Sequence, residues 1–137
     1  MKTLKTLKTI PLLTLIALTM ACGYSSKATT PSVAGTAPAI SQLNPNAVTA
    51  GGDAFILTVN GTNFGAKAIV NWNGAAQTSN TTFMSATELT VAVPASAIAS
   101  SGTVQITVTN PATSGSGAYG SGGTLAATSP AMSFTIN

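Results

Sequence analysis

The sequence predicts an all-β fold, a sandwich of about seven strands that begins near residue 38. Three observations support this. From residue 38 onward, apolar residues alternate with small or polar ones in one run after another, which is the period of a half-buried strand. Turn-forming pairs such as Asn44-Pro45 and Asn73-Gly74 separate the runs. About seven strands in about 100 residues have the size and rhythm of an immunoglobulin-like sandwich.

The predicted strands follow one another at regular spacing. The first contains Ile40 and Leu43, and the fourth lies around Thr82 and Phe83. The others are expected, in chain order, over residues 55–60, 68–73, 89–94, 104–109 and 132–137. One face of each run is apolar, so two sheets packed face to face would bury these faces against each other.

The predicted core has no disulfide, because the chain contains a single cysteine. It must therefore rest on aliphatic side chains together with aromatic ones, and a domain of this length can bury enough apolar surface for that. Trp72 alternates with Ala68 and Val70, which places it on an apolar face. The aromatic residues expected in the core are Phe55, Phe64, Trp72, Phe83 and Phe134.

The N-terminus has the pattern of a secretory signal peptide, predicted over residues 1–21. The first nine residues carry three lysines and no acid, and an apolar stretch of 12 residues follows, ending at Ala21. A helix that spans a bilayer needs about 20 apolar residues. The stretch is therefore long enough for an export signal and too short for a membrane span.

Cys22 follows the apolar stretch directly, and in an exported chain it has no cysteine to pair with. Residues 18–23 resemble a bacterial lipobox, in which the cysteine is acylated and becomes the first residue of the mature protein. The leucine of that motif stands one position further out here, at Leu18, with Thr19 in its usual place. We expect lipidation at Cys22 and a membrane anchor, with ordinary cleavage and secretion as the alternative.

Residues 22–37 are rich in Ser, Thr, Gly and Ala and predict a flexible, lipid-anchored linker, followed by one domain over residues 38–137. The formal net charge of +3 belongs to the predicted signal. After its removal two lysines, Lys27 and Lys67, balance two acids, Asp53 and Glu88. A nearly uncharged exported domain predicts no nucleic-acid partner.

The run from Pro38 to Phe64 resembles the opening of IPT/TIG domains, which are immunoglobulin-like folds. It contains a Pro-x-Ile start, a double-glycine turn, an alternating strand and a Gly-Thr-Asn-Phe motif at residues 61–64. The later stretches at residues 70–74, 82–95 and 104–111 and the final strand also fit. The resemblance implies a binding, adhesion or spacer module and brings no catalytic site with it.

The sequence contains no candidate catalytic residue, metal ligand set or cofactor site. Without histidine, a Ser-His-Asp triad and imidazole metal sites are excluded. Asp53 and Glu88 are the only acids, and we interpret them as turn and solvated residues rather than as a glycosidase pair. We therefore expect that the protein is not an enzyme.

A long segment, residues 112–130, separates the last two predicted strands. Gly115, Gly117 and Gly120 match the dinucleotide pattern G-x-G-x-x-G, but no helix and no later acid follow them, so the match is compositional. We name Tyr119, Gly117 and Gly120 as candidate ligand contacts, with a disordered or neutral loop as the alternative. In an immunoglobulin-like topology this segment lies at the pole where the first strand begins.

These observations predict a non-enzymatic, lipid-anchored cell-envelope protein whose single domain binds an unidentified surface protein or glycan. The alternative is a glycan-binding accessory protein beside a polysaccharide-processing enzyme or transporter. Because sugars stack on exposed aromatic rings, that alternative requires an accessible Trp72 or Tyr119.

Overall fold

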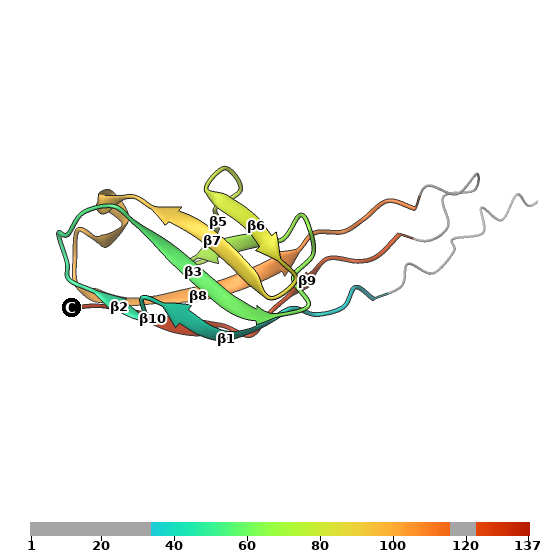
Figure 1. Ribbon diagram of the computed structural model, residues 1–137, viewed down its shortest axis with the longest axis horizontal. Coiled ribbons are helices and arrows are strands. Elements are labelled where there is room, and N and C mark those ends of the chain that lie inside the picture. Colours follow the sequence, from blue (N-terminus) through green and yellow to red (C-terminus); the bar gives the residue numbers. More distant parts are fainter. Residues whose placement is uncertain (1–33, 116–122) are drawn as a thin grey trace, which may run out of the picture.

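The fold is described by a computed structural model, which covers residues 34–115 and 123–137 (Figure 1). The predicted signal peptide and most of the predicted linker lie outside these residues. The described ranges contain the predicted domain, apart from residues 116–122, and the four residues that precede it.

The described residues form ten strands and one short 3₁₀ helix. In chain order they are β1 (Ala39–Asn44), β2 (Ala47–Val48), β3 (Phe55–Thr62), β4 (Ile69–Trp72), β5 (Ala75–Ala76), β6 (Thr81–Ser85), β7 (Glu88–Val93), η1 (Ala95–Ile98), β8 (Gly102–Asn110), β9 (Ala127–Thr128) and β10 (Met132–Ile136). The seven longer strands coincide with the seven predicted ones, which confirms the all-β prediction. Two-residue strands such as β2 are too short to show an alternating pattern. No helix in this part of the chain is long and apolar enough to cross a membrane.

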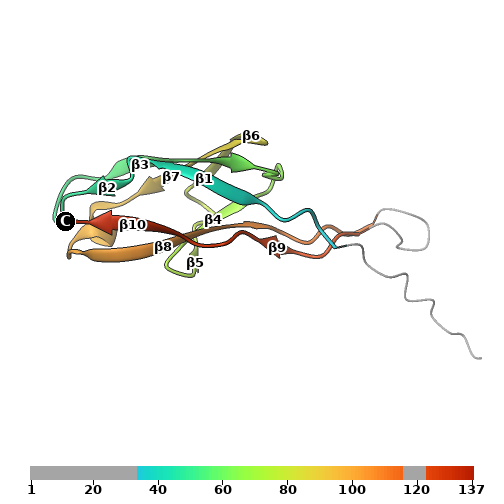
Figure 2. The same ribbon diagram turned by 90° about the horizontal axis from the view of Figure 1, so that it is seen from below.

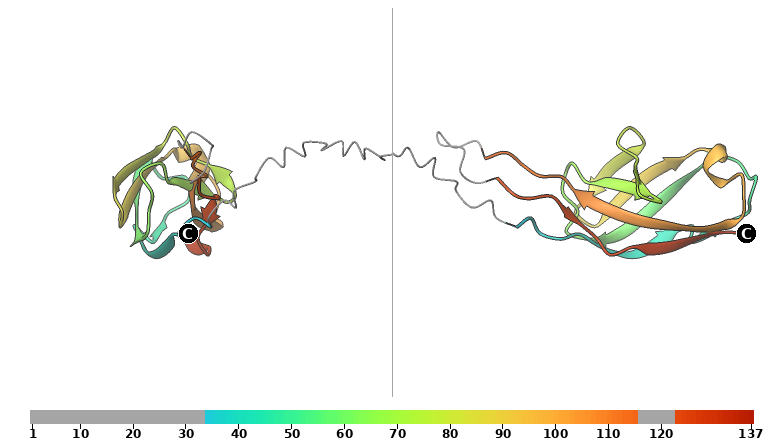
Figure 3. Two further views of the ribbon diagram at one scale, coloured as in Figure 1. Left: turned by 90° about the vertical axis from the view of Figure 1, so that its right-hand side faces the viewer. Right: turned by 180° about the vertical axis from the view of Figure 1, so that it is seen from behind.

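The strands form two sheets that pack face to face as layers of a sandwich (Figure 2). One sheet has the order β1-β3-β7-β6, and the other has the order β2-β10-β8-β4-β5, with β9 also paired to β8. Most neighbours are antiparallel, and β2 runs parallel to β10. The end-on view in Figure 3 shows the two layers enclosing the interior.

The core lies between the sheets because the alternating residues of each strand face inward. In β3, for example, Leu57 and Val59 face inward and are fully buried. Ile56, the residue before Leu57, faces outward and is 57% exposed. The same alternation holds in β4, β7, β8 and β10. The buried hydrophobic residues are Leu43, Leu57, Val59, Phe64, Ala68, Val70, Leu89, Val91, Val93, Ile98, Val104, Ile106, Val108, Phe134 and Ile136.

Phe134 of β10 lies at the centre of an aromatic group. Its ring stacks on Phe55 with centroids 5.8 Å apart and meets the Trp72 ring at 5.3 Å. Trp72 itself is half-buried and packs against the core. The prediction that Trp72 belongs to the core is therefore confirmed.

The prediction that Phe83 belongs to the core is wrong, since its side chain is 37% exposed. Phe83 lies opposite Leu89 of β7, but β6 is the edge strand of its sheet and the register shifts between Phe83 and Ser85. A bulge bends an edge strand away from the interior. An alternating pattern cannot distinguish an edge strand from a central one.

The long axis of the sandwich ends in two poles (Figure 1). At the distal pole, which includes η1 and the C-terminal residue, backbone hydrogen bonds close the structure. The Ala50 N–H donates to the Asn137 carbonyl at 2.7 Å, and the Gly51 N–H donates to the Ile98 carbonyl at 2.8 Å. The other end is the groove pole, where residues 34–37 (the entry segment) enter β1.

The long segment over residues 112–130 contains paired structure at its base, which the sequence did not predict. β9 pairs with β8, and Thr113 bridges Thr124 beyond the end of both strands. Residues 110–115 and 123–128 therefore continue the sheet as a two-stranded ribbon that projects from the groove pole (Figure 1). Backbone hydrogen bonds between Thr113 and Thr124 join the two strands of the ribbon, and their hydroxyl oxygens also lie 2.9 Å apart.

Candidate functional site: a groove at one pole of the sandwich

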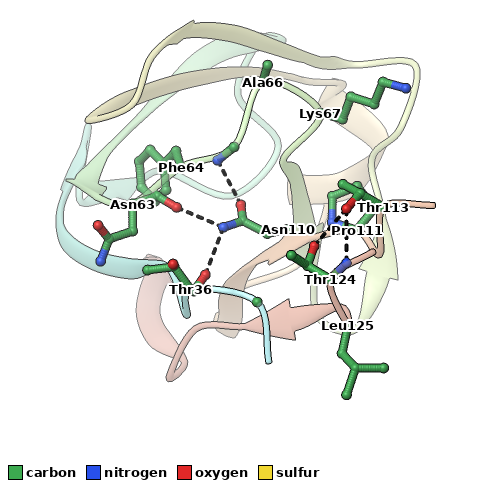
Figure 4. A pocket seen from close by; sticks show the side chains of 12 residues that line it. Thr36, Asn63, Phe64, Ala66, Lys67, Asn110, Pro111, Thr113, Thr124 and Leu125 are labelled. Carbon is green, nitrogen blue, oxygen red and sulfur yellow. Dashed lines mark hydrogen bonds between the residues drawn. The ribbon is translucent and has the colours of Figure 1, made fainter. Parts of the chain in front are cut away.

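A hollow of about 550 Å³ lies at the groove pole (Figure 4). Its walls come from the entry segment, from residues 63–67 between β3 and β4, and from both strands of the ribbon. We call it the pole groove. Its volume lies within the range of about 300–1,000 Å³ that small-molecule sites occupy.

The Gly-Thr-Asn-Phe motif forms one wall of the pole groove. Gly61 has no room for a side chain, because an added Cβ would overlap the Ala39 carbonyl oxygen and the Phe64 ring. Asn63 has a φ of 60°, in the left-handed region that asparagine tolerates better than most residues. This turn buries the Phe64 side chain and leaves the Asn63 backbone carbonyl free to accept a hydrogen bond.

Asn110, the last residue of β8, joins three segments of the groove through one side chain (Figure 4). Its Oδ1 accepts from the Gly65 N–H at 2.9 Å. Its Nδ2 donates to the Asn63 carbonyl at 2.7 Å and to the Thr36 carbonyl at 3.1 Å. The Asn110 amide therefore links the entry segment, the β3–β4 turn and the ribbon, and the Asn63 Nδ2 adds a hydrogen bond to the Ala37 carbonyl at 3.4 Å.

The contact with Thr36 also locates the base of the 112–130 segment. The entry segment leads directly into β1, so the ribbon and the start of the first strand lie at the same pole. The prediction of their common pole is confirmed by this contact. Gly35 lies so close to the ribbon that an added Cβ would overlap the Leu125 carbonyl oxygen.

The pole groove has little charge. Lys67 is exposed at its rim and is the only cation among the described residues. The remaining polar groups of the lining are amides, hydroxyls and backbone groups, while Phe64, Pro111 and Leu125 supply apolar surface. Such a lining can bind a largely uncharged partner and offers one positive charge to a carboxylate.

The four site residues predicted from the sequence lie outside the described residues. They are the lipidation candidate Cys22 and the loop contacts Gly117, Tyr119 and Gly120. The structure describes the base of their segment, where Thr113 and Thr124 line the pole groove. Sequence reasoning missed Asn110, because the Asn-Pro pair at residues 110–111 was interpreted as a turn signal only.

Trp72 gives no support to a sugar-stacking site. Its ring packs on Phe134, and beside it lies a cavity of about 130 Å³ that is also lined by Gln77 and Pro94. The glycan alternative therefore depends on the part of Trp72 that remains exposed or on Tyr119, which lies outside the described residues.

Asp53 and Glu88 do not form a carboxylate pair. Asp53 is in the turn before β3, whereas Glu88 lies opposite Asn60 near the other end of that strand. From Phe55 to Asn60 the strand spans about 17 Å, compared with a separation of about 5 to 9.5 Å between glycosidase carboxylates. Among the described residues no three His, Cys, Asp or Glu side chains gather where they could hold a metal ion.

The strand order, the Gly-Thr-Asn-Phe turn and the sandwich core agree with the sequence relationship of the chain to one known family. The sequence profile of the IPT/TIG domain matches residues 38–125, more than half of the chain. The chain belongs to the IPT/TIG domain family. No curated protein and no solved structure matches the chain significantly.

The IPT/TIG match begins immediately before β1 and ends in the ribbon at Leu125. β10 lies beyond the matched residues, yet it pairs with β8 from Met132 to Ile136 and supplies Phe134 to the core. The sandwich of this IPT/TIG domain therefore includes a strand outside the match. Family membership indicates an immunoglobulin-like binding or adhesion module and identifies no partner.

Proposed function

We propose that the protein is an exported, lipid-anchored binding module of the cell envelope, and that its partner docks at the pole groove. The IPT/TIG match supports the binding role, and the N-terminal sequence pattern supports export and acylation at Cys22. The partner proposed is another protein of the envelope.

The observation that carries the proposal is the construction of the pole groove from three separate segments around Asn110. Binding sites on rigid sandwiches are built from loops at one end of the sheets. Here the hydrogen bonds of Asn110 fix the walls before any partner arrives, which lowers the ordering cost of binding.

The near-neutral charge of the groove predicts how binding depends on salt. With Lys67 as its only charged lining residue, the groove offers at most one ion pair to a partner. An exposed ion pair contributes about 0–1 kcal/mol and is screened by salt. Partner affinity should therefore change by less than about tenfold between low and high ionic strength.

Site-directed photocrosslinking in the cells that make the protein tests the docking site. A photoreactive amino acid replaces Ala66, at the groove, or Gln105, on the outer face of the six-stranded sheet as a matched control. The proposal expects adducts from position 66 only. Adducts that are equal at both positions, or found only at 105, would contradict it.

The anchor is tested separately by cell fractionation of Cys22→Ser. The unmodified protein should sediment with membranes, and the variant should move to the soluble or secreted fraction because it cannot be acylated. A variant that remains with membranes would contradict acylation at Cys22 and leave the docking site untouched.

A further inference from the structure

The ribbon has one open edge beside the pole groove. β8 pairs with β4 only as far as Thr109, opposite Ile69, whereas on its other side the pairing continues to Thr113. Beyond Thr109, no described strand pairs with the β4 side of the ribbon. Figure 2, where β4 is labelled, shows the ribbon extending past that strand.

Hydrogen bonding across the ribbon determines which backbone groups face the open edge. The Thr113 N–H donates to the Thr124 carbonyl at 3.0 Å, and the Thr124 N–H donates to the Thr113 carbonyl at 3.1 Å. Backbone groups of successive strand residues point to opposite sides. The N–H and C=O groups of Ala112 and Ser114, both exposed residues, therefore point away from Thr124 and toward the open edge.

The opposite edge of the ribbon is already covered. Gly35 of the entry segment lies against the backbone of Leu125. A Cβ added at Gly35 would also lie 3.7 Å from the Ala127 side chain. Asn110 holds this segment in place through the Thr36 carbonyl. Of the two ribbon edges, the Ala112–Ser114 edge is therefore the one that no strand of the described residues pairs with.

The surroundings of this edge indicate the chemistry of its occupant. Phe64 and Pro111 give the adjoining groove an apolar lining, and Lys67 at the rim is its one charge. The groove, about 550 Å³, has room for a side chain of the occupant. Pro111 lacks an N–H, so the edge offers two donors and suits a short extended segment.

We propose that a short extended peptide of the partner adds as a strand to the Ala112–Ser114 edge, with a side chain in the pole groove and a carboxylate near Lys67. This is strand addition to an exposed sheet edge, in which main-chain hydrogen bonds supply affinity and an adjoining pocket supplies specificity. The inference rests on the proposed function and names the partner's chemical class.

The test uses random hexapeptides with free carboxyl termini, selected on the full chain carrying Cys22→Ser. With a selected hexapeptide bound, amide hydrogen exchange at Ala112 and Ser114 should slow at least tenfold, because both N–H groups gain acceptors. Exchange at Thr113 should change little, because its N–H is already bonded across the ribbon.

Two changes separate the backbone and charge contributions. Two peptides are compared, one N-methylated at its odd-numbered residues and one at its even-numbered residues. One of them should lose binding and the other should retain it, because only one set of N–H groups faces the ribbon. Lys67→Met should weaken binding of the free-carboxylate peptide about threefold to tenfold, Lys67→Arg should retain it, and the amidated peptide should not distinguish the three proteins.

Several results would overturn the inference. Selection of no hexapeptide, protection at β1 or β6 instead of the ribbon, or equal binding of the two N-methylated peptides would each do so. Concentration-dependent protection of Ala112 and Ser114 without peptide would show that a second copy occupies the edge. In each case adducts from position 66 in cells would still support the proposed function, so the two failures are distinguishable.

Discussion

The two poles of the sandwich are closed by different means. At the distal pole, several backbone hydrogen bonds connect the segments, and the Ile98 side chain is buried in the core with 1% of its surface exposed. At the groove pole, one side chain, Asn110 at the base of the ribbon, makes two hydrogen bonds to the β3–β4 turn and one to the entry segment. The distal pole therefore depends on burial and backbone hydrogen bonds, whereas the three segments at the groove pole are linked mainly through the amide of Asn110. We expect the first to govern global stability and the second to govern the shape of the site.

The largest predicted effect is at the distal pole. Ile98→Ala removes a buried aliphatic side chain and leaves a cavity, so the free energy of unfolding should fall by about 2–4 kcal/mol. Urea denaturation measures it. Ile56→Ala is the matched control, because Ile56 is 57% exposed, and it should cost less than about 1 kcal/mol. Equal losses in the two variants would contradict the role assigned to burial at this pole.

At the groove pole, Asn110→Ala should lower the free energy of unfolding by about 1–2 kcal/mol. The loss is smaller than at Ile98 because water can reach most of the groups left without partners. Hydrogen exchange should accelerate at Gly65 and stay unchanged at Gly51, which is at the distal pole. Asn110→Asp keeps the acceptor for the Gly65 N–H and loses the amide donor, so it should retain only part of the Gly65 protection. Acceleration at both poles would show that the poles are not independent.

Gly51→Ala tests the backbone of the distal turn. Gly51 has a φ of 69° and open space around it, so an added Cβ meets no atom but is strained by the left-handed backbone. The expected cost is about 1 kcal/mol, measured by thermal or urea unfolding. If the variant is as stable as the parent, the turn must be able to adopt another conformation.

Gly35→Ala should have the smallest global effect and a clear local one. The added Cβ collides with the Leu125 carbonyl oxygen, so the entry segment must move off the ribbon. Unfolding free energy should change by less than about 0.5 kcal/mol, since the contact is at the surface. Nuclear magnetic resonance shifts should nevertheless change at Thr36, Asn110 and Leu125. Unchanged shifts there would contradict the close contact between entry segment and ribbon.

The sequence predicted the sandwich because its strands are long enough for their alternation to be recognised. Leu57 and Val59 face inward as the period of two requires, and the Gly-Thr-Asn-Phe motif indicated the family. Phe83 was misplaced because alternation identifies the face of a strand and not its position in the sheet. An edge position depends on which strands pair, and pairing is not a local property of the sequence.

The site was less predictable than the fold. The amide of Asn110 bonds to Asn63 and Thr36, which are 47 and 74 residues away along the chain. Hydrogen-bond partners so far apart in the sequence cannot be predicted from a local sequence pattern. The Asn-Pro pair at residues 110–111 was a visible signal, but it is equally typical of a simple turn. The long segment after β8 directed attention to the groove pole, although the hydroxyl pairing of Thr113 with Thr124 was not foreseen.

The position of Asn110 between the entry segment and the ribbon has a mechanical consequence. If a partner held at the ribbon is pulled against the N-terminal segment, the load passes from the ribbon to residues 34–37 at one end of the molecule. The ladders of the two sheets then carry little of the force. The first connections to be loaded are the hydrogen bonds of one amide and the contact between Gly35 and Leu125. Under tension this end would yield first, while the folded sandwich stays intact behind it.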